Sequence, residues 1–148
     1  MTSEATLVEI PQGVCPTHYN VASTSSPNIS EGTALALDDG RELSSGNLSP
    51  NAVLTALRPF AGISVAEYDQ SENPASHPVY EKGSRVIYEV KLAGDCAIGD
   101  EAYISGANGF GSLTALEATV SEAKLSKYKA GTFLDAGSNN EIVELLLD

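Results

Sequence analysis

The sequence has few of the features that would indicate a metal site, a disulfide framework or a membrane-spanning segment. Its two cysteines, Cys15 and Cys96, lie 81 positions apart and form no CxxC or Cys/His motif. No run of about 18 apolar residues is present, so no membrane-spanning segment is predicted. The first ten residues lack the basic start and the apolar stretch of a secretory signal. We therefore expect no cofactor, no metal ion and no membrane partner.

Basic residues are also scarce. The chain has 8 Lys and Arg against 20 Asp and Glu, which gives a net charge of −12. Such a surface repels nucleic acid and anionic lipid, so neither is an expected partner. The excess of acid has two interpretations. It is typical of proteins that work in concentrated salt, where self-repulsion is screened within about 3 Å at 1 M. An ordinary acidic protein is the alternative.

The size of the chain is enough for one core. At 148 residues the sequence fits a single domain that buries roughly 70% of the surface of its unfolded chain. The two cysteines are interpreted as small buried hydrophobic residues, although a disulfide between them is left open.

The first thirty residues differ from the rest. Residues 13–30 are rich in Ser, Thr, Pro and Asn and have weak periodicity, which favours an extended arm. The arm is preceded by a short β-prone run that contains Leu7, Val8 and Ile10. We predict that these three side chains form an interface, in which the run adds a strand to a sheet edge of its own chain or of a neighbour.

From residue 31 to residue 148 the pattern is that of short strands separated by turns. Leu35 and Leu37 alternate before the turn at 38–40, and residues 85–91 alternate between apolar and polar faces. A β-prone run, 141–148, closes the sequence. We predict a mainly β fold, a small β-sandwich or barrel with an extended N-terminal arm and at most one or two short helices. The two candidate helices are residues 49–59 and residues 114–130, the second ending near Gly131.

The sequence also contains an internal similarity between two segments. The segment that begins at Gly32 is similar to the segment that begins at Gly99, 67 positions later. The Ala-Gly pair that ends at Gly62 matches the pair that ends at Gly131, 69 positions later. This comparison predicts two related β-units that bury a shared face.

The glycine-rich stretch 104–113 contains Gly106, Gly109 and Gly111. A phosphate-binding loop needs a set glycine spacing and a helix start after it, and the order of residues here fits neither known pattern. Asn108-Gly109 is a favoured pair for a tight hairpin turn. The stretch is therefore interpreted as the tip of a β-hairpin.

No catalytic constellation is apparent, so we expect a protein that is not an enzyme. His18 and His77 lie in segments that contain a nearby proline and are interpreted as surface or loop histidines. Residues 134–141 offer oxygen ligands for Ca²⁺, namely Asp135, Asn139, Asn140 and Glu141. Their spacing departs from an EF-hand loop, and a turn between two strands is the favoured interpretation.

The order of elements resembles the capsid cement, or head decoration, proteins of tailed viruses. The similarity lies in four segments of this sequence: residues 32–37, 61–65, 86–100 and 142–147. It implies a structural protein on the outer surface of the mature capsid that bridges major capsid subunits, often as a homotrimer. In this interpretation residues 31–148 form the capsid-binding domain and residues 1–30 form the arm. With the acidic composition, the resemblance suggests a virus of a salt-loving, haloarchaeal host.

Two other functions are considered. A different virion module, associated with a tail, spike or fibre, would share the composition and lack a site. A small carboxylate-dependent hydrolase would require a deep pocket with two carboxylates of separated pKa values.

Overall fold

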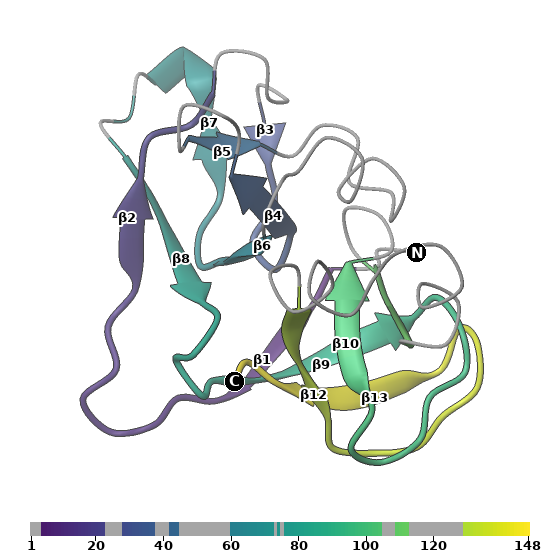
Figure 1. Ribbon diagram of the computed structural model, residues 1–148. Helices are drawn as coiled ribbons and strands as arrows, with labels where there is room; N and C mark the ends of the chain where they lie inside the picture. Colours follow the sequence, from purple (N-terminus) through teal and green to yellow (C-terminus); the bar gives the residue numbers. More distant parts are fainter. Residues whose placement is uncertain are drawn as a thin grey trace.

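The computed structural model describes residues 4–22, 28–37, 42–44, 60–72, 74, 76–104, 109–112 and 129–148, and the regular secondary structure of these residues is almost entirely β-strand (Figure 1). The strands are β1 (Thr6–Glu9), β2 (Thr17–Tyr19), β3 (Asn28–Ile29), β4 (Ala34–Leu37), β5 (Leu43–Ser44), β6 (Phe60–Ser64), β7 (Tyr68–Asp69), β8 (His77–Glu81), β9 (Ile87–Leu92), β10 (Glu101–Ile104), β11 (Gly109–Ser112), β12 (Lys129–Phe133) and β13 (Ile142–Leu146). The described ranges include one short 3₁₀ helix, η1 (Gln70–Glu72), and no helix that is long and apolar enough to cross a bilayer. The prediction of a mainly β fold is confirmed.

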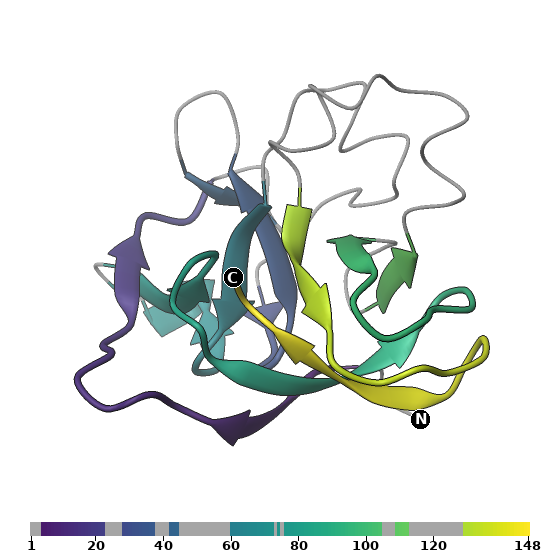
Figure 2. The same ribbon diagram turned by 60° about the horizontal axis from the view of Figure 1, so that its bottom comes forward.

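The larger sheet closes on itself. Its strand order is β1-β9-β11-β10-β12-β13, and β9 also pairs with β13. The pairing of β9 with β13 joins the two ends of the series β9, β11, β10, β12, β13 into a small barrel. β1 is added outside this ring, antiparallel to the first half of β9. Figure 2 shows β9 and β13 side by side at the front of the molecule.

The second sheet has the order β2-β8-β6-β4-β5. A parallel bridge between Val21, just after β2, and Leu43 of β5 brings its two ends together. In the larger sheet, the end of β9 is likewise parallel to β11, with Leu92 opposite Phe110. Both sheets therefore close in the same way, with a parallel contact beside an otherwise antiparallel series.

The two closed sheets are copies of one arrangement. We call β2, β4, β5, β6 and β8 the first unit, and β9, β10, β11, β12 and β13 the second unit. In the first unit Leu35 pairs with Gly62, and in the second Ala102 pairs with Gly131. Each pairing has a register shift at the following residue of β4 or β10. The small β3–β7 pair of the first unit has its counterpart in the isolated bridge between Cys96 and Gly137.

Backbone hydrogen bonds repeat with the same spacing. Gly32 N donates to Ser64 O at 2.8 Å, and Gly99 N donates to Phe133 O at 2.9 Å. The two donors, Gly32 and Gly99, are 67 positions apart, and the two acceptors, Ser64 and Phe133, are 69 positions apart, which are the offsets of the internal comparison. The structure thus confirms that the sequence contains two related β-units.

In both units the backbone of a glycine packs closely against the neighbouring strand, β8 in the first unit and β13 in the second. A Cβ at Gly62 would lie 2.5 Å from the carbonyl oxygen of Tyr80, and a Cβ at Gly131 would overlap with the carbonyl oxygen of Leu146. Real Cβ atoms do not approach backbone this closely. The Ala-Gly pair recurs in both units because a larger residue at the second position would push the strands apart.

The units share a core. One cluster of buried residues draws Ala34, Phe60, Ile63 and Tyr80 from the first unit and the buried side chains of β9, β10, β12 and β13 from the second. A smaller cluster lies inside the first unit. Residues from both sequence halves fill one interior, which is the shared face that the internal comparison predicts.

The predicted helix at residues 114–130 is wrong at its C-terminal end. The helix predicted for 114–130 and its end near Gly131 conflict with β12, which contains Lys129, Ala130 and Gly131. Pairing of β12 with β10 and β13 satisfies its backbone and buries its small residues, and this non-local pairing overrides the local capping pattern. Residues 114–128 and the predicted helix at 49–59 lie outside the described residues.

Candidate functional site

The three predicted interface residues lie on or next to β1, at the edge of the larger sheet. Leu7, Val8 and Ile10 expose 40%, 45% and 41% of their surface. All four residues of β1 are exposed, although the strand is paired with β9. The β-prone run thus presents a short apolar strip to solvent.

β1 is held by its own chain. Leu7 lies opposite Tyr88 of β9, and Ala5 N donates to Gly32 O at 2.9 Å. Further along, β2 pairs with β8 and β3 pairs with β7. Of the two sheet edges considered for this run, the structure shows the one in its own chain. A contact of the strip with a neighbour stays a prediction.

An open groove of about 550 Å³ runs beside β1. Its walls carry three carboxylates, and it is lined by Glu4, Ala5, Thr6, Leu7, Ser30, Glu31 and Glu67. Glu67 Oε1 accepts a hydrogen bond from Glu31 N at 3.2 Å, and Glu4 Oε2 is buried without a hydrogen-bond partner. The described residues contain no group of three or more His, Cys, Asp and Glu that could hold a metal ion.

His77 is buried, so its interpretation as a surface or loop histidine is wrong. It begins β8, and its Nε2 lies 2.6 Å from Ser64 Oγ, which donates its own proton to Ala66 O at 2.7 Å. Ser64 therefore accepts from His77, the reverse of the direction in which a histidine activates a serine nucleophile. The ring of Tyr68 meets the imidazole edge-on, with centroids 5.4 Å apart. Burial lowers the pKa of His77, and His18 adds to this effect. His18 itself is exposed on β2.

The residues considered for Ca²⁺ hold turns together. Asp135 Oδ2 accepts from Glu144 N at 3.2 Å, and Glu141 Oε1 accepts from Ser138 N at 2.9 Å. Asn140 has a positive φ of 72°, as expected in a tight turn. Each carboxylate is engaged by backbone N–H groups, which agrees with the turn interpretation.

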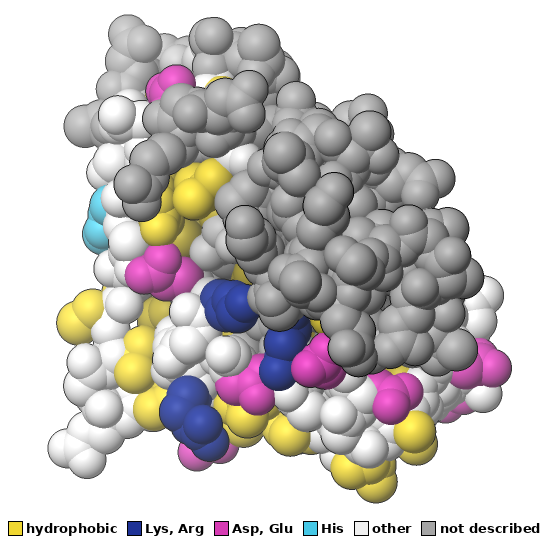
Figure 3. All heavy atoms as spheres, viewed as in Figure 1, with side chains coloured by type: hydrophobic (Ala, Val, Ile, Leu, Met, Phe, Trp, Pro, Cys, Tyr) yellow, Lys and Arg dark blue, Asp and Glu magenta, His cyan; other side chains and the backbone are white. Residues whose placement is uncertain are grey.

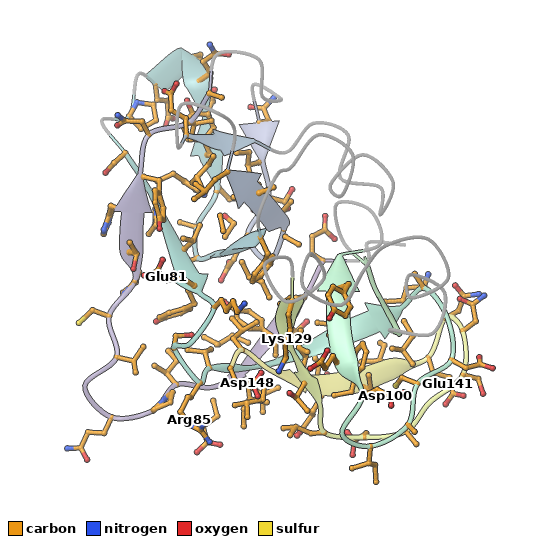
Figure 4. All side chains as sticks on the ribbon, viewed as in Figure 1. Glu81, Arg85, Asp100, Lys129, Glu141 and Asp148 are labelled. Carbon is orange, nitrogen blue, oxygen red and sulfur yellow. The ribbon has the colours of Figure 1, made fainter. Side chains whose placement is uncertain are left out.

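Two carboxylates meet the only lysine of β12. Lys129 Nζ lies 3.9 Å from Glu101 Oε1 and 3.6 Å from Asp148 Oδ1. Tyr103 donates to Glu101, and Thr132 donates to Asp148. Figure 4 shows Lys129 and Asp148 close together where β12 meets the end of the chain. Lys129, Glu101 and Asp148 thus connect β10, β12 and residue 148, and these contacts hold the ends of the strands together.

The glycine-rich stretch is a hairpin, as predicted. β10 and β11 pair antiparallel with Tyr103 opposite Gly111 and Ile104 opposite Phe110. The prediction that Asn108-Gly109 forms the tight turn is wrong for Gly109, because this residue lies within β11, and residues 105–108 lie outside the described residues. The parallel contact of β11 with β9 places the hairpin in the closing position of the second unit.

The cysteines differ from their interpretation as two buried hydrophobic residues. Cys15 is exposed, Cys96 is partly buried, and neither is in a disulfide. Cys96 donates to Asp135 O at 3.4 Å, and burial raises the pKa of its thiol. Cys15 is exposed because it lies in the connection between β1 and β2, two strands at sheet edges.

Comparisons with known proteins do not identify a family for this chain. No model of a known protein family matches the chain. A search of curated proteins found no significant match. The functional inference therefore depends on the residues described above.

Proposed function

We propose that this protein is a capsid cement protein, which binds the outside of the mature shell of a tailed virus and bridges neighbouring major capsid subunits. The observation that carries the proposal is the apolar strip of Leu7, Val8 and Ile10 on an edge strand of an otherwise strongly acidic protein. Apolar side chains exposed together in this way favour a protein partner.

The strip would act as the anchor. Docking on a capsid subunit removes the exposed apolar area from water, and the outer edge of β1 can add to a strand of the partner. A homotrimer presents three such strips at once, so that weak contacts combine through effective concentration. The net charge of −12 disfavours adventitious binding to DNA.

Co-sedimentation with shells of the major capsid protein from the same genome tests this function. We expect saturable binding at a fixed ratio to the capsid subunit. Truncating an apolar interface side chain costs on the order of 1 kcal/mol, so Leu7→Ser, Val8→Ser and Ile10→Ser together should weaken binding about a hundredfold. These point changes replace deletion of residues 1–30, because that segment also supplies β2 and β3.

The matched control is Ile98→Ser. Ile98 is 72% exposed on the turn before β10, far along the chain from the strip. It should bind shells like the unmodified protein. Failure of the unmodified protein to bind expanded shells at both low and molar salt would refute the proposed function.

A further inference from the structure

The outer edge of β2, which faces away from β8, is an unfilled strand position. His18 lies opposite Pro78, which has no N–H and whose C=O accepts a hydrogen bond from Val65 N at 3.1 Å. Pro78 therefore bonds toward β6 and not toward β2. Because successive backbone groups of a strand point in alternate directions, the N–H and C=O of His18 point away from β8. Neither group has a hydrogen-bond partner among the described residues.

The second unit covers the equivalent edge with its own chain. Glu89 of β9 is the counterpart of His18, because their partners in β13 and β8 correspond. On the other side of β9, Thr6 of β1 lies opposite Glu89. Figures 1 and 2 both draw β2 at the margin of the molecule, with no other described strand beyond it. The fold thus accepts a strand at this position, and the first unit leaves the position open.

The backbone groups that flank His18 on this edge are one acceptor and one donor. Leu43 N donates to the C=O of Asn20 at 2.8 Å, so only the N–H of Asn20 is available. Pro16 has no N–H and offers only its C=O. In chain order the edge presents an acceptor at Pro16, a donor and an acceptor at His18, and a donor at Asn20.

This order of donors and acceptors is complementary to itself. In an antiparallel pairing about a twofold axis at His18, the two His18 residues exchange both of their hydrogen bonds. The N–H of Asn20 in each copy then meets the C=O of Pro16 in the other. The register would otherwise join a Pro16 N–H to an Asn20 C=O. The first of these groups does not exist, and the second is already bonded to Leu43, so no edge group is left unpaired.

The charge distribution favours a second copy as the occupant. Residues 10–30, which include β2, contain no Asp, Glu, Lys or Arg, although the chain has a net charge of −12. Two copies of an acidic protein repel each other least where the surface carries no acid. The carboxylate of Glu81 beside β2 is engaged by Thr17 and Tyr19. Figure 3 shows few charged side chains along the margin that β2 occupies.

We propose that two copies of this protein pair through the outer edges of their β2 strands, antiparallel and with the two His18 residues opposite each other. The pairing joins the β2-β8-β6-β4-β5 sheets of the two copies into one continuous sheet. The strands are short, so the contact is weak and reversible. β1 and its apolar strip belong to the other sheet, and the inference does not depend on the capsid function.

Sedimentation equilibrium of the full chain in molar KCl tests the pairing with two variants. His18→Pro removes the outward N–H and spares the bonds to β8, because proline is tolerated in an edge strand where its nitrogen faces solvent. His18→Ala is the matched control, which removes the side chain and keeps the backbone groups. We expect the unmodified chain and His18→Ala to associate reversibly. The dissociation constant of His18→Pro should be higher by about tenfold or more.

A cross-link tests the register. His18→Cys and Asn20→Cys are each made together with Cys15→Ser and Cys96→Ser. Opposed residues of a hydrogen-bonded antiparallel pair have Cα atoms about 5.5 Å apart, which lies within the range of disulfides. Under mild oxidation His18→Cys should give a disulfide-linked pair of chains. Asn20→Cys, which would face Pro16 of the other copy, should give little.

Each outcome decides. A mass of the unmodified chain that does not rise with concentration overturns the inference, and so does equal association of His18→Pro. Loss of association in His18→Ala also overturns it, because the contact would then belong to the side chain. Equal cross-linking at residues 18 and 20, or none at either, excludes the twofold register, and this measurement decides alone if His18→Pro does not fold. No arm uses shells, so failure of the capsid proposal is scored separately.

Discussion

At the scale of single residues, the two Ala-Gly pairs are the positions that the architecture tolerates least. Gly131 lies between β10 and β13, and its missing Cβ leaves room for the carbonyl oxygen of Leu146. Gly62 plays the same role against Tyr80. The repeat of this close approach in both units explains why the dipeptide recurs where the surrounding sequence has diverged.

Gly131→Ala should destabilise the fold. Overpacking of this kind costs about 1–3 kcal/mol, because paired backbones must separate. At this chain length each 1 kcal/mol lowers the melting temperature by about 2–4 °C. Calorimetry would measure the shift, with Gly94→Ala as control, since no atom lies within 4 Å of a Cβ there. Equal melting temperatures for the two variants would contradict the packing explanation.

His77 gives the fold a dependence on pH. Burial lowers its pKa in the folded protein below the value of about 6.5 in the unfolded chain. The unfolded chain then binds more protons in the window between the two values, so stability falls as the pH drops from 6.5 toward the folded pKa. The charge of Glu67 raises the pKa of His77 and so opposes the effect of burial. The second unit has Val143 at the position that corresponds to His77, so this titrating group belongs to the first unit.

His77→Leu should remove most of this dependence. Denaturant unfolding at pH values between 5 and 8 would give the free energy of unfolding of both proteins. The unmodified protein should lose stability below pH 6.5, while the variant should show a flatter profile whatever its absolute stability. Parallel profiles would show that His77 is not the titrating group.

At the scale of elements, the short strand β2 depends on side-chain contacts. It has three residues, and two of their hydroxyl groups reach one carboxylate of β8. Thr17 Oγ1 and Tyr19 OH donate to the two oxygens of Glu81, each at 2.8 Å. Figure 4 places Glu81 on β8 beside β2. In the second unit, where β9 is longer, the corresponding residue is the buried Leu147.

Glu81→Leu should therefore loosen β2. Two hydroxyl groups lose their acceptor, for an expected cost of about 1–3 kcal/mol. Hydrogen exchange should accelerate in residues 17–19 and remain unchanged in β9. Glu72→Gln, an exposed glutamate without such contacts, serves as the control. Unaltered exchange in β2 after Glu81→Leu would show that backbone pairing alone holds the strand.

At the scale of the whole molecule, the two units share a hydrophobic interior, and the chain has a net charge of −12. Twenty acids repel one another in dilute buffer, where screening extends over about 10 Å at 0.1 M salt. In molar salt the same charges are screened within about 3 Å. The acidic composition therefore matters for stability, whatever the protein binds.

Adding KCl from 0.1 to 2 M should raise the melting temperature by about 4 °C or more, which corresponds to about 1 kcal/mol of relieved repulsion or more. Scanning calorimetry in KCl would measure the rise, and sucrose would serve as a neutral osmolyte control. A flat or falling curve in KCl would remove the proposal of a salt-loving host while leaving the cement function untouched.

Much of the fold follows from local patterns in the sequence. The alternation in residues 85–91 predicts the inward and outward faces of β9, because successive side chains of a strand point to opposite sides. Gly106 to Gly111 predict the hairpin of β10 and β11. The offsets of 67 and 69 positions predict the duplication, since each unit needs its Ala-Gly pair in the same place.

Other features were decided only by tertiary structure. The burial of His77, the exposure of Cys15 and the strand at Gly131 depend on which distant segments pair, and local sequence carries no record of that pairing. The opposition of Glu89 and Glu144 is likewise set by register between strands more than fifty positions apart. The sequence alone determined the β pattern, its repeat and its charge, because these are properties of neighbouring residues and of composition. The closed sheets and the shared core arise only when non-local pairing brings remote residues together.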